Sequence, residues 1–133
     1  MWPPHVERVA AVLRAAGVEG RLEELPQEER VPPGPAVRAE AYDCDGRSVV
    51  ALVPADRDLD RRKLARAARC EAVRPTDRPA FPYANAVVLI DRLVLGEPAV
   101  WIEAGSPRHV VELAPAQLVH LTHAQTTDLV ADA

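Results

Sequence analysis

Several features of common protein classes are scarce or absent in this chain of 133 residues. It has two cysteines, Cys44 and Cys70, without metal-site spacing, so we expect free thiols in a reducing cytosol, with a disulfide as the alternative. It has one lysine, Lys63, so chemistry that needs a lysine depends on that residue or on the N-terminus. No apolar run approaches the ~18 residues that cross a membrane, and the start MWPPHVERV lacks the pattern of a secretory signal. We therefore expect a cytoplasmic protein with no membrane partner.

The charge balance also limits the kind of partner. The chain has 16 basic and 20 acidic residues, and its net charge of −4 argues against non-specific coating of DNA or RNA. A local basic patch stays open. The length suits one domain with one core, which we place over residues 1–133.

The clearest structural signal lies in Val37–Pro54, where two apolar-rich runs flank Asp45-Gly46. Asp-Gly between such runs predicts a tight β-hairpin, because glycine adopts a positive φ without steric cost. The second arm, Ser48–Val53, is nearly all apolar, which is typical of a strand buried on both faces. On the first arm the charged Arg38 alternates with small apolar residues, so it faces either solvent or a pocket.

The N-terminal third has one helical pattern. Apolar residues recur at helical spacing from Val6 to Leu13, which predicts a helix over His5–Ala16 with Gly17 as its stop. Arg21–Leu25 predicts a short edge strand. The prolines of Gln27–Pro35 exclude a regular helix, so this segment is a stiff connector.

A second helix follows the hairpin. Asp58 or Asp60 can cap it, and it runs to about Arg69 with a face rich in arginine. That face either touches RNA phosphates or is simply solvated, and the second interpretation is favoured. The remaining pattern predicts a brief strand, a proline-rich loop, two further strands, a turn, a third strand, a short helix and a final return to the sheet. In order, these are Glu71–Val73, Arg74–Asn85, Ala86–Ile90, Ala99–Glu103, the turn Gly105-Ser106-Pro107, His109–Leu113, Pro115–Leu121 and Gln125–Leu129. The fold class is therefore α+β, a mixed sheet with helices packed on it.

Four segments in this order, residues 6–26, 45–68, 87–95 and 104–122, resemble the YbaK-type aminoacyl-tRNA editing domains, also called prolyl-tRNA synthetase-associated domains. The resemblance implies a central, partly barrel-like mixed sheet. It also implies a free-standing enzyme that hydrolyses the ester of a mischarged aminoacyl-tRNA in trans. The implied partner is the 3′ end of that tRNA, and no cofactor is implied.

The chain departs from the family pattern at three places. Arg38 stands where the family has a lysine, and the connector stands where the family has an amphipathic helix. The family's glycine-rich loop is matched only by Pro79-Ala80-Phe81-Pro82, preceded by Arg78 and without a glycine. Losing these glycines removes places where the backbone can approach a ligand closely.

Taken residue by residue, the resemblance makes Arg38, Gly105 and Ser106 the candidate catalytic residues. The candidate binding residues are Pro79, Phe81, Pro107, His109 and Asp91. Asp91 follows a buried strand, so it also suits the holding of a turn. His109 lies near Ser106, but a serine-hydrolase triad is not evident. His120 and His123 lack a third ligand, so no metal is expected.

Two hypotheses follow. The first is a trans-editing deacylase. The second is a degenerate member that binds tRNA, an aminoacyl-adenosine-like ligand or a protein partner without turnover. A third and blander interpretation is a dimeric scaffold, and the sequence leaves monomer and homodimer both open.

Overall fold

The computed structural model describes residues 2–28 and 31–132, which form a mixed eight-stranded sheet flanked by three α-helices. This arrangement confirms the predicted α+β class. In chain order, the elements are α1 (Pro4–Ala15), β1 (Arg21–Glu24), β2 (Ala36–Cys44), β3 (Arg47–Pro54), α2 (Arg61–Ala68), β4 (Arg74–Pro75), β5 (Val87–Asp91), the 3-10 helix η1 (Arg92–Gly96), β6 (Val100–Ser106), β7 (His109–Leu113), α3 (Pro115–Thr122) and β8 (Gln125–Thr127).

The sheet is built around the predicted hairpin. Its strand order is β1-β7-β6-β2-β3-β5-β8, and the short β4 pairs with β2. β2 and β3 pair without interruption from Val37 opposite Pro54 to Cys44 opposite Arg47. Asp45 and Gly46 both have positive φ values, 53° and 86°, as a two-residue turn between twisted strands requires. The hairpin prediction is confirmed.

β3 is buried on both faces, as its apolar run predicts. Val50 and Leu52 belong to the main core, while Val49, Ala51 and Val53 face a second core on the other side. The second core is closed by α2 through Leu64, Ala65 and Ala68. The hairpin therefore separates two apolar layers.

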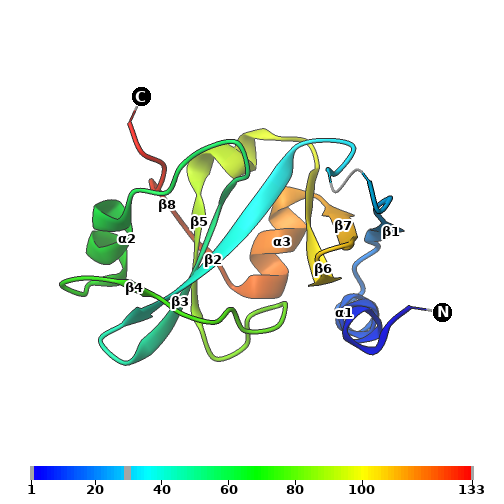
Figure 1. The fold of residues 1–133 in the computed structure, drawn as a ribbon, viewed down its shortest axis with the longest axis horizontal. Coiled ribbons are helices and arrows are strands. Elements are labelled where there is room, and N and C mark those ends of the chain that lie inside the picture. The colour runs from blue at the N-terminus through cyan, green and yellow to red at the C-terminus, as the bar shows by residue number, and fades with distance from the viewer. Residues whose placement is uncertain (1, 29–30, 133) are drawn as a thin grey trace.

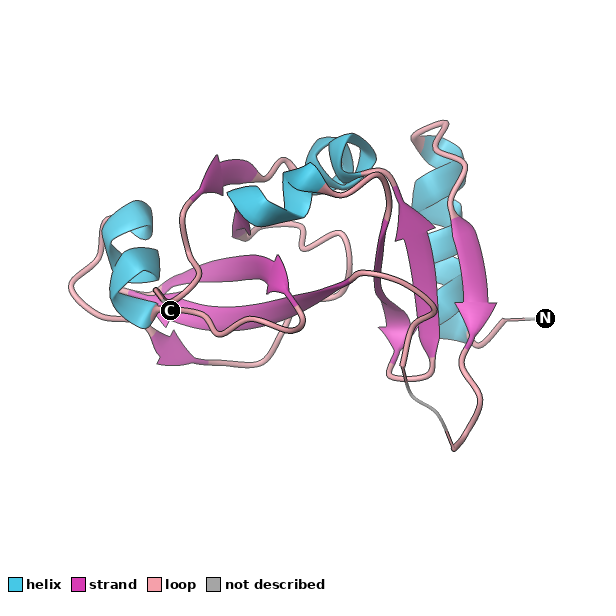
Figure 2. Ribbon diagram, turned by 90° about the horizontal axis from the view of Figure 1, so that it is seen from above, coloured by secondary structure: helices cyan, strands magenta, loops and turns pink. Residues whose placement is uncertain are grey.

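The helices cover different parts of the sheet. α1 buries Val6, Val9, Ala10 and Leu13 and contacts β6. Figures 1 and 2 place α1 and α2 at opposite ends of the molecule, with α3 between them. Asp60 rather than Asp58 caps α2, because its Oδ1 accepts the backbone N–H groups of Arg62 and Lys63.

The chain after β8 is fixed to α2 and β5 by polar contacts. Fully buried Asp91 accepts the backbone N–H groups of Leu129 and Val130 at 2.7 and 3.0 Å. The Nζ of Lys63 donates to Asp128, Asp132 and the carbonyl of Val130. These contacts raise the pKa of Lys63, mainly through the hydrogen bonds to Asp132 and Asp128. β8 ends at Thr127, so the predicted strand to Leu129 is too long.

The largest correction concerns the cysteines. Cys44 and Cys70 form a disulfide, with their Cα atoms 5.8 Å apart, instead of the free thiols that we expected. Cys44 ends β2 and Cys70 follows α2, so the packing of α2 against the hairpin brings them together. The spacing of the two cysteines in the sequence does not predict this contact.

Two element boundaries also differ from prediction. No strand forms over Glu71–Val73; the chain instead pairs with β2 at Arg74–Pro75, opposite Tyr42 and Asp43. β6 extends to Ser106, so the predicted turn Gly105-Ser106-Pro107 begins inside a strand, after a register shift between Glu103 and Ser106. Within residues 2–28 and 31–132, no helix has the length and apolar character needed to cross a membrane.

Candidate functional site

The candidate site lies where β2 and β6 separate. The two strands pair in parallel only at Ala36–Val37 and Trp101–Ile102, and then diverge. A cavity of about 280 Å³ opens beside this point. Among its lining residues are Arg38 and Ala39 from β2, Ile102 and Glu103 from β6, the loop residue Arg78, and Pro107. The structure therefore brings two predicted site residues, Arg38 and Pro107, to one cavity.

Arg78 spans the gap between the two strands. Its Nη1 donates to the carbonyl of Ala39 at 3.3 Å, and its Nη2 pairs with the carboxylate of Glu103. Ala39 does not pair with β6, because the pairing of β2 with β6 covers only Ala36 and Val37. The Arg78 guanidinium therefore supplies the hydrogen bond that a β6 backbone N–H would otherwise donate to Ala39. Sequence reasoning missed this role, although Arg78 directly precedes the segment matched to the family loop.

Arg38 is heavily engaged by the protein itself. Its Nε and Nη2 both donate to Glu40 Oε2, and its Nη1 and Nη2 donate to the carbonyls of Ala55 and Arg57. A guanidinium has five N–H groups, so these four hydrogen bonds leave one N–H for a ligand. Glu40 also accepts the hydroxyl of Tyr42, whose pKa is raised by burial and by this hydrogen bond.

The proline-rich loop lines a second cavity, of about 470 Å³, together with α1. Pro79, Phe81 and Gly105 contribute to its walls. Phe81 is largely buried and packs edge-on against Tyr83, at 5.5 Å between ring centroids. Burial raises the pKa of the Tyr83 hydroxyl above its ordinary value. Phe81 therefore serves the core as well as the cavity wall.

Gly105 has a packing reason for being a glycine. Its φ is +93°, and a Cβ there would lie 2.6 Å from the carbonyl oxygen of His5. The absent side chain thus allows the first turn of α1 to approach β6. This explanation requires no ligand.

Ser106 and His109 form a local pair. Ser106 Oγ lies 2.7 Å from His109 Nδ1 and accepts the backbone N–H of Arg108. His109 is buried, with the ring of Trp2 edge-on at 5.6 Å and Glu24 at 4.0 Å from its Nε2. Neither residue lines the three cavities found in the described residues. The pair holds the turn between β6 and β7 through these local hydrogen bonds.

Asp91 is placed for a structural task. Its carboxylate accepts the backbone N–H of Leu93 at the start of η1 and those of Leu129 and Val130. It is fully buried and lines none of the three cavities in the part of the chain described here. This arrangement agrees with the interpretation of Asp91 as a carboxylate that holds a turn, and its role as a binding residue stays a prediction. The described residues also contain no group of three or more side chains suited to a metal ion.

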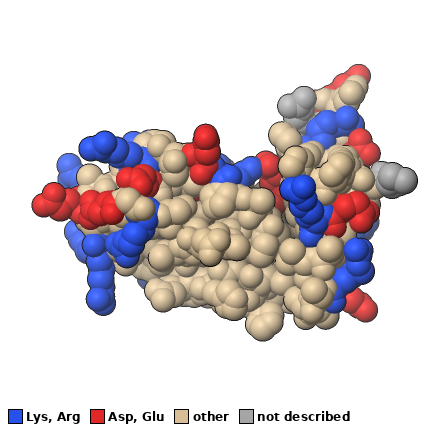
Figure 3. Space-filling model, turned by 90° about the horizontal axis from the view of Figure 1, so that it is seen from below, with Lys and Arg blue, Asp and Glu red and all other residues tan. Residues whose placement is uncertain are grey.

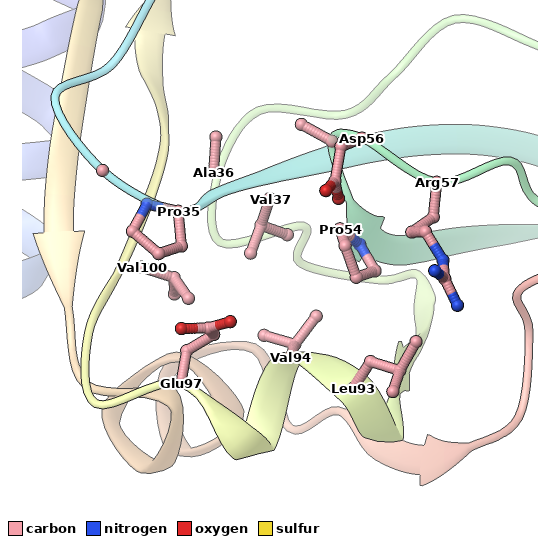
Figure 4. A pocket seen from close by; sticks show the side chains of 12 residues that line it. Pro35, Ala36, Val37, Pro54, Asp56, Arg57, Leu93, Val94, Glu97 and Val100 are labelled. Carbon is pink, nitrogen blue, oxygen red and sulfur yellow. The ribbon is translucent and has the colours of Figure 1, made fainter.

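A third cavity, of about 540 Å³, lies next to the first and was not foreseen from the sequence. It is enclosed by the start of β2, the loop after β3, and η1, and it shares Ala36, Val37 and Ala55 with the smaller cavity. Figure 4 shows Asp56 and Arg57 on its Pro54 side and Glu97 near Pro35 and Val100.

Charged side chains are unevenly distributed over the surface. On the face in Figure 3 they gather toward the two ends, and a broad area between them carries none. At the end of the molecule that carries α2, basic and acidic side chains are mixed. This mixture favours the interpretation of the arginine-rich face of α2 as a solvated surface.

Comparison with known proteins finds solved structures that share this fold. No family model and no curated protein matches the chain. Among solved structures, one described as a "putative trans-editing enzyme for prolyl tRNA synthetase" has a TM-score of 0.88 and 23% identity, covering 99% of this chain and 100% of its own. A structure from epitope backbone grafting onto scaffold proteins has a TM-score of 0.86, 24% identity and the same coverage. A hypothetical protein has a TM-score of 0.78 and 19% identity, covering 93% and 99%. The chain thus has the fold of these proteins, including one described as an editing enzyme.

Proposed function

We propose that the protein acts on the 3′ end of a mischarged aminoacyl-tRNA as a trans-editing deacylase, with the 280 Å³ cavity as the place of the ester. The observation that carries the proposal is the meeting of Arg38, Arg78 and Pro107 at the split between β2 and β6. The fold shared with a structure described as an editing enzyme supports the same kind of function.

The reaction needs stabilisation of the negative charge on the carbonyl oxygen and a positioned water. Water adds to the ester carbonyl, the bond to the ribose oxygen breaks, and the amino acid and a free ribose hydroxyl leave. Two guanidinium groups line the cavity, and such groups stabilise the negative charge that develops on the carbonyl oxygen or hold the terminal phosphate. Glu103 is the carboxylate in the same cavity and is a candidate for positioning the water.

The second candidate function is binding without turnover. It is favoured by the hydrogen bonds of Arg38, which leave that residue little capacity for a substrate. In this case the protein holds tRNA, an aminoacyl-adenosine-like ligand or a protein partner at the same cavity. We propose a cytoplasmic location for either function, and neither function requires a cofactor. Both a monomer and a homodimer are compatible with either function.

A panel of tRNAs, each charged with an incorrect amino acid, tests the proposal. The deacylase predicts faster release of at least one amino acid than in buffer, and slower release by Arg78→Gln and Glu103→Gln. Arg14→Gln, on the outer face of α1, is the matched control and retains full activity. Binding of charged tRNA without release would favour the second function, and neither binding nor release would exclude both.

A further inference from the structure

The 540 Å³ cavity has the composition of a small-molecule site. Its floor is apolar, formed by the buried residues Val37, Val94 and Val100, with Pro35 and Pro54 on the walls. Leu93 lies at the rim and is 44% exposed. Cavities of this size and lining are the ones that enclose small organic ligands.

Its charged side chains are the carboxylates of Asp56 and Glu97, on separate walls, and the guanidinium of Arg57. Asp56 comes from the loop after β3 and Glu97 from the end of η1. Neither forms an ion pair or a side-chain hydrogen bond with another described residue, although Arg57 lies on the same rim. The net charge of the lining is therefore negative.

Both carboxylates stand on a fixed backbone. Arg38 donates to the carbonyls of Ala55 and Arg57, the two residues that flank Asp56. Ala55 also donates its N–H to the carbonyl of Ala36 at 2.9 Å. On the other wall, Asp91 caps η1, and the N–H of Glu97 donates to the carbonyl of Val94. Such preorganisation lowers the cost of ordering the site when a ligand binds.

We propose that this cavity binds a small organic amine: an ammonium group held between Asp56 and Glu97, with an apolar body against Val37, Val94 and Val100. An organic anion is disfavoured by the two carboxylates. A bare metal ion is disfavoured because the described residues offer no set of three ligands here. The cavity adjoins the proposed editing cavity and shares Ala36, Val37 and Ala55 with it, but the inference does not depend on the editing activity.

Titration of the isotopically labelled full chain with three probes of equal length tests the inference by NMR. The probes are n-hexylamine, 1-hexanol and hexanoate. We expect saturable shifts in the methyl signals of Val37, Val94 and Val100 with hexylamine, binding that is weaker by about fivefold with hexanol, as for loss of partly exposed ion pairs, and no saturation with hexanoate.

Two variants separate the contribution of the carboxylate charges to amine binding from that of the shape of the cavity. Asp56→Asn and Glu97→Gln should each bring the affinity for hexylamine toward that for hexanol, whereas Glu71→Gln, on the exposed segment after α2, should leave it unchanged. Equal affinities for hexylamine and hexanol in the unmodified chain, shifts located elsewhere, or no saturation with any probe would each overturn the inference. All of these outcomes are independent of whether any aminoacyl-tRNA is hydrolysed.

Discussion

Arg38 and Glu40 are joined by two hydrogen bonds, from Nε at 3.2 Å and from Nη2 at 3.1 Å, both to Glu40 Oε2. Two more bonds tie the same guanidinium to the loop after β3. Arg38 therefore fixes a wall shared by the two neighbouring cavities. A lysine, the residue of the family pattern, has one ammonium group and no planar fork, so it cannot reproduce this set of contacts.

Replacing Arg38 by lysine tests whether the arginine is mainly structural. We expect Arg38→Lys to lower the free energy of unfolding by about 1 kcal/mol, because the lost hydrogen bonds are partly exposed. Urea denaturation measures the change, with Arg14→Lys on α1 as a control that stays within experimental error. An unchanged midpoint for Arg38→Lys would remove the structural role and leave only the proposed role of Arg38 at the ester.

Gly105→Ala tests the close approach of α1 to β6. The substitution should destabilise the fold by about 2 kcal/mol or more, since it combines an unfavourable φ with a clash against the His5 carbonyl. Gly46→Ala is the matched control, because Gly46 also has a positive φ but a Cβ added there would meet no atom within 4 Å. Equal losses of stability in the two variants would mean that the contact with His5 contributes nothing.

Much of the fold was predictable from local pattern. The Asp45-Gly46 turn, the all-apolar second arm and the spacing from Val6 to Leu13 each follow rules of a few residues, and the structure bears them out. Contacts between distant segments were not predictable. The Cys44–Cys70 disulfide and the Arg78 bridge both depend on how α2 and a loop pack against β2.

The candidate site was only partly predictable for the same reason. The resemblance selected Arg38 and Pro107, which share a cavity, but it gave no information on how many partners Arg38 already has. Gly105 and Asp91 were selected as site residues, whereas close packing and hydrogen bonding explain them without a ligand. The 540 Å³ cavity combines three distant segments, so no local motif indicates it.

The disulfide gives a direct stability prediction. It links residues 26 apart in sequence, and closing a loop of that size stabilises a fold by about 3.5 kcal/mol in the chain-entropy model. Urea denaturation with and without reductant should show a loss of this order, and the double variant Cys44→Ala, Cys70→Ala should not respond to reductant. Titration of two free thiols in the native, unreduced protein would contradict the bond.

The ion pairs of Lys63 with the C-terminal segment predict that the stability of the fold depends on pH. Its pKa in the folded chain is raised above the ordinary value of 10.5, mainly by Asp132 and Asp128. The stabilisation is therefore complete below pH 10.5 and is lost as the pH rises through the folded-state pKa. Lys63→Met should be less stable than the unmodified chain at pH 8, and the difference in urea midpoints should narrow above pH 10.5. A difference that is constant with pH would show that packing of the side chain, and not its charge, is responsible.

The central claim is that the split between β2 and β6 receives the aminoacylated end of a tRNA. The most direct test is an NMR titration of the labelled protein with a non-hydrolysable amide analogue of 3′-aminoacyl-adenosine. The account predicts saturable shifts at Ala39, Ile102 and Glu103, and their loss in Arg78→Gln. Shifts confined to other parts of the molecule, or no saturable binding at low salt, would contradict it.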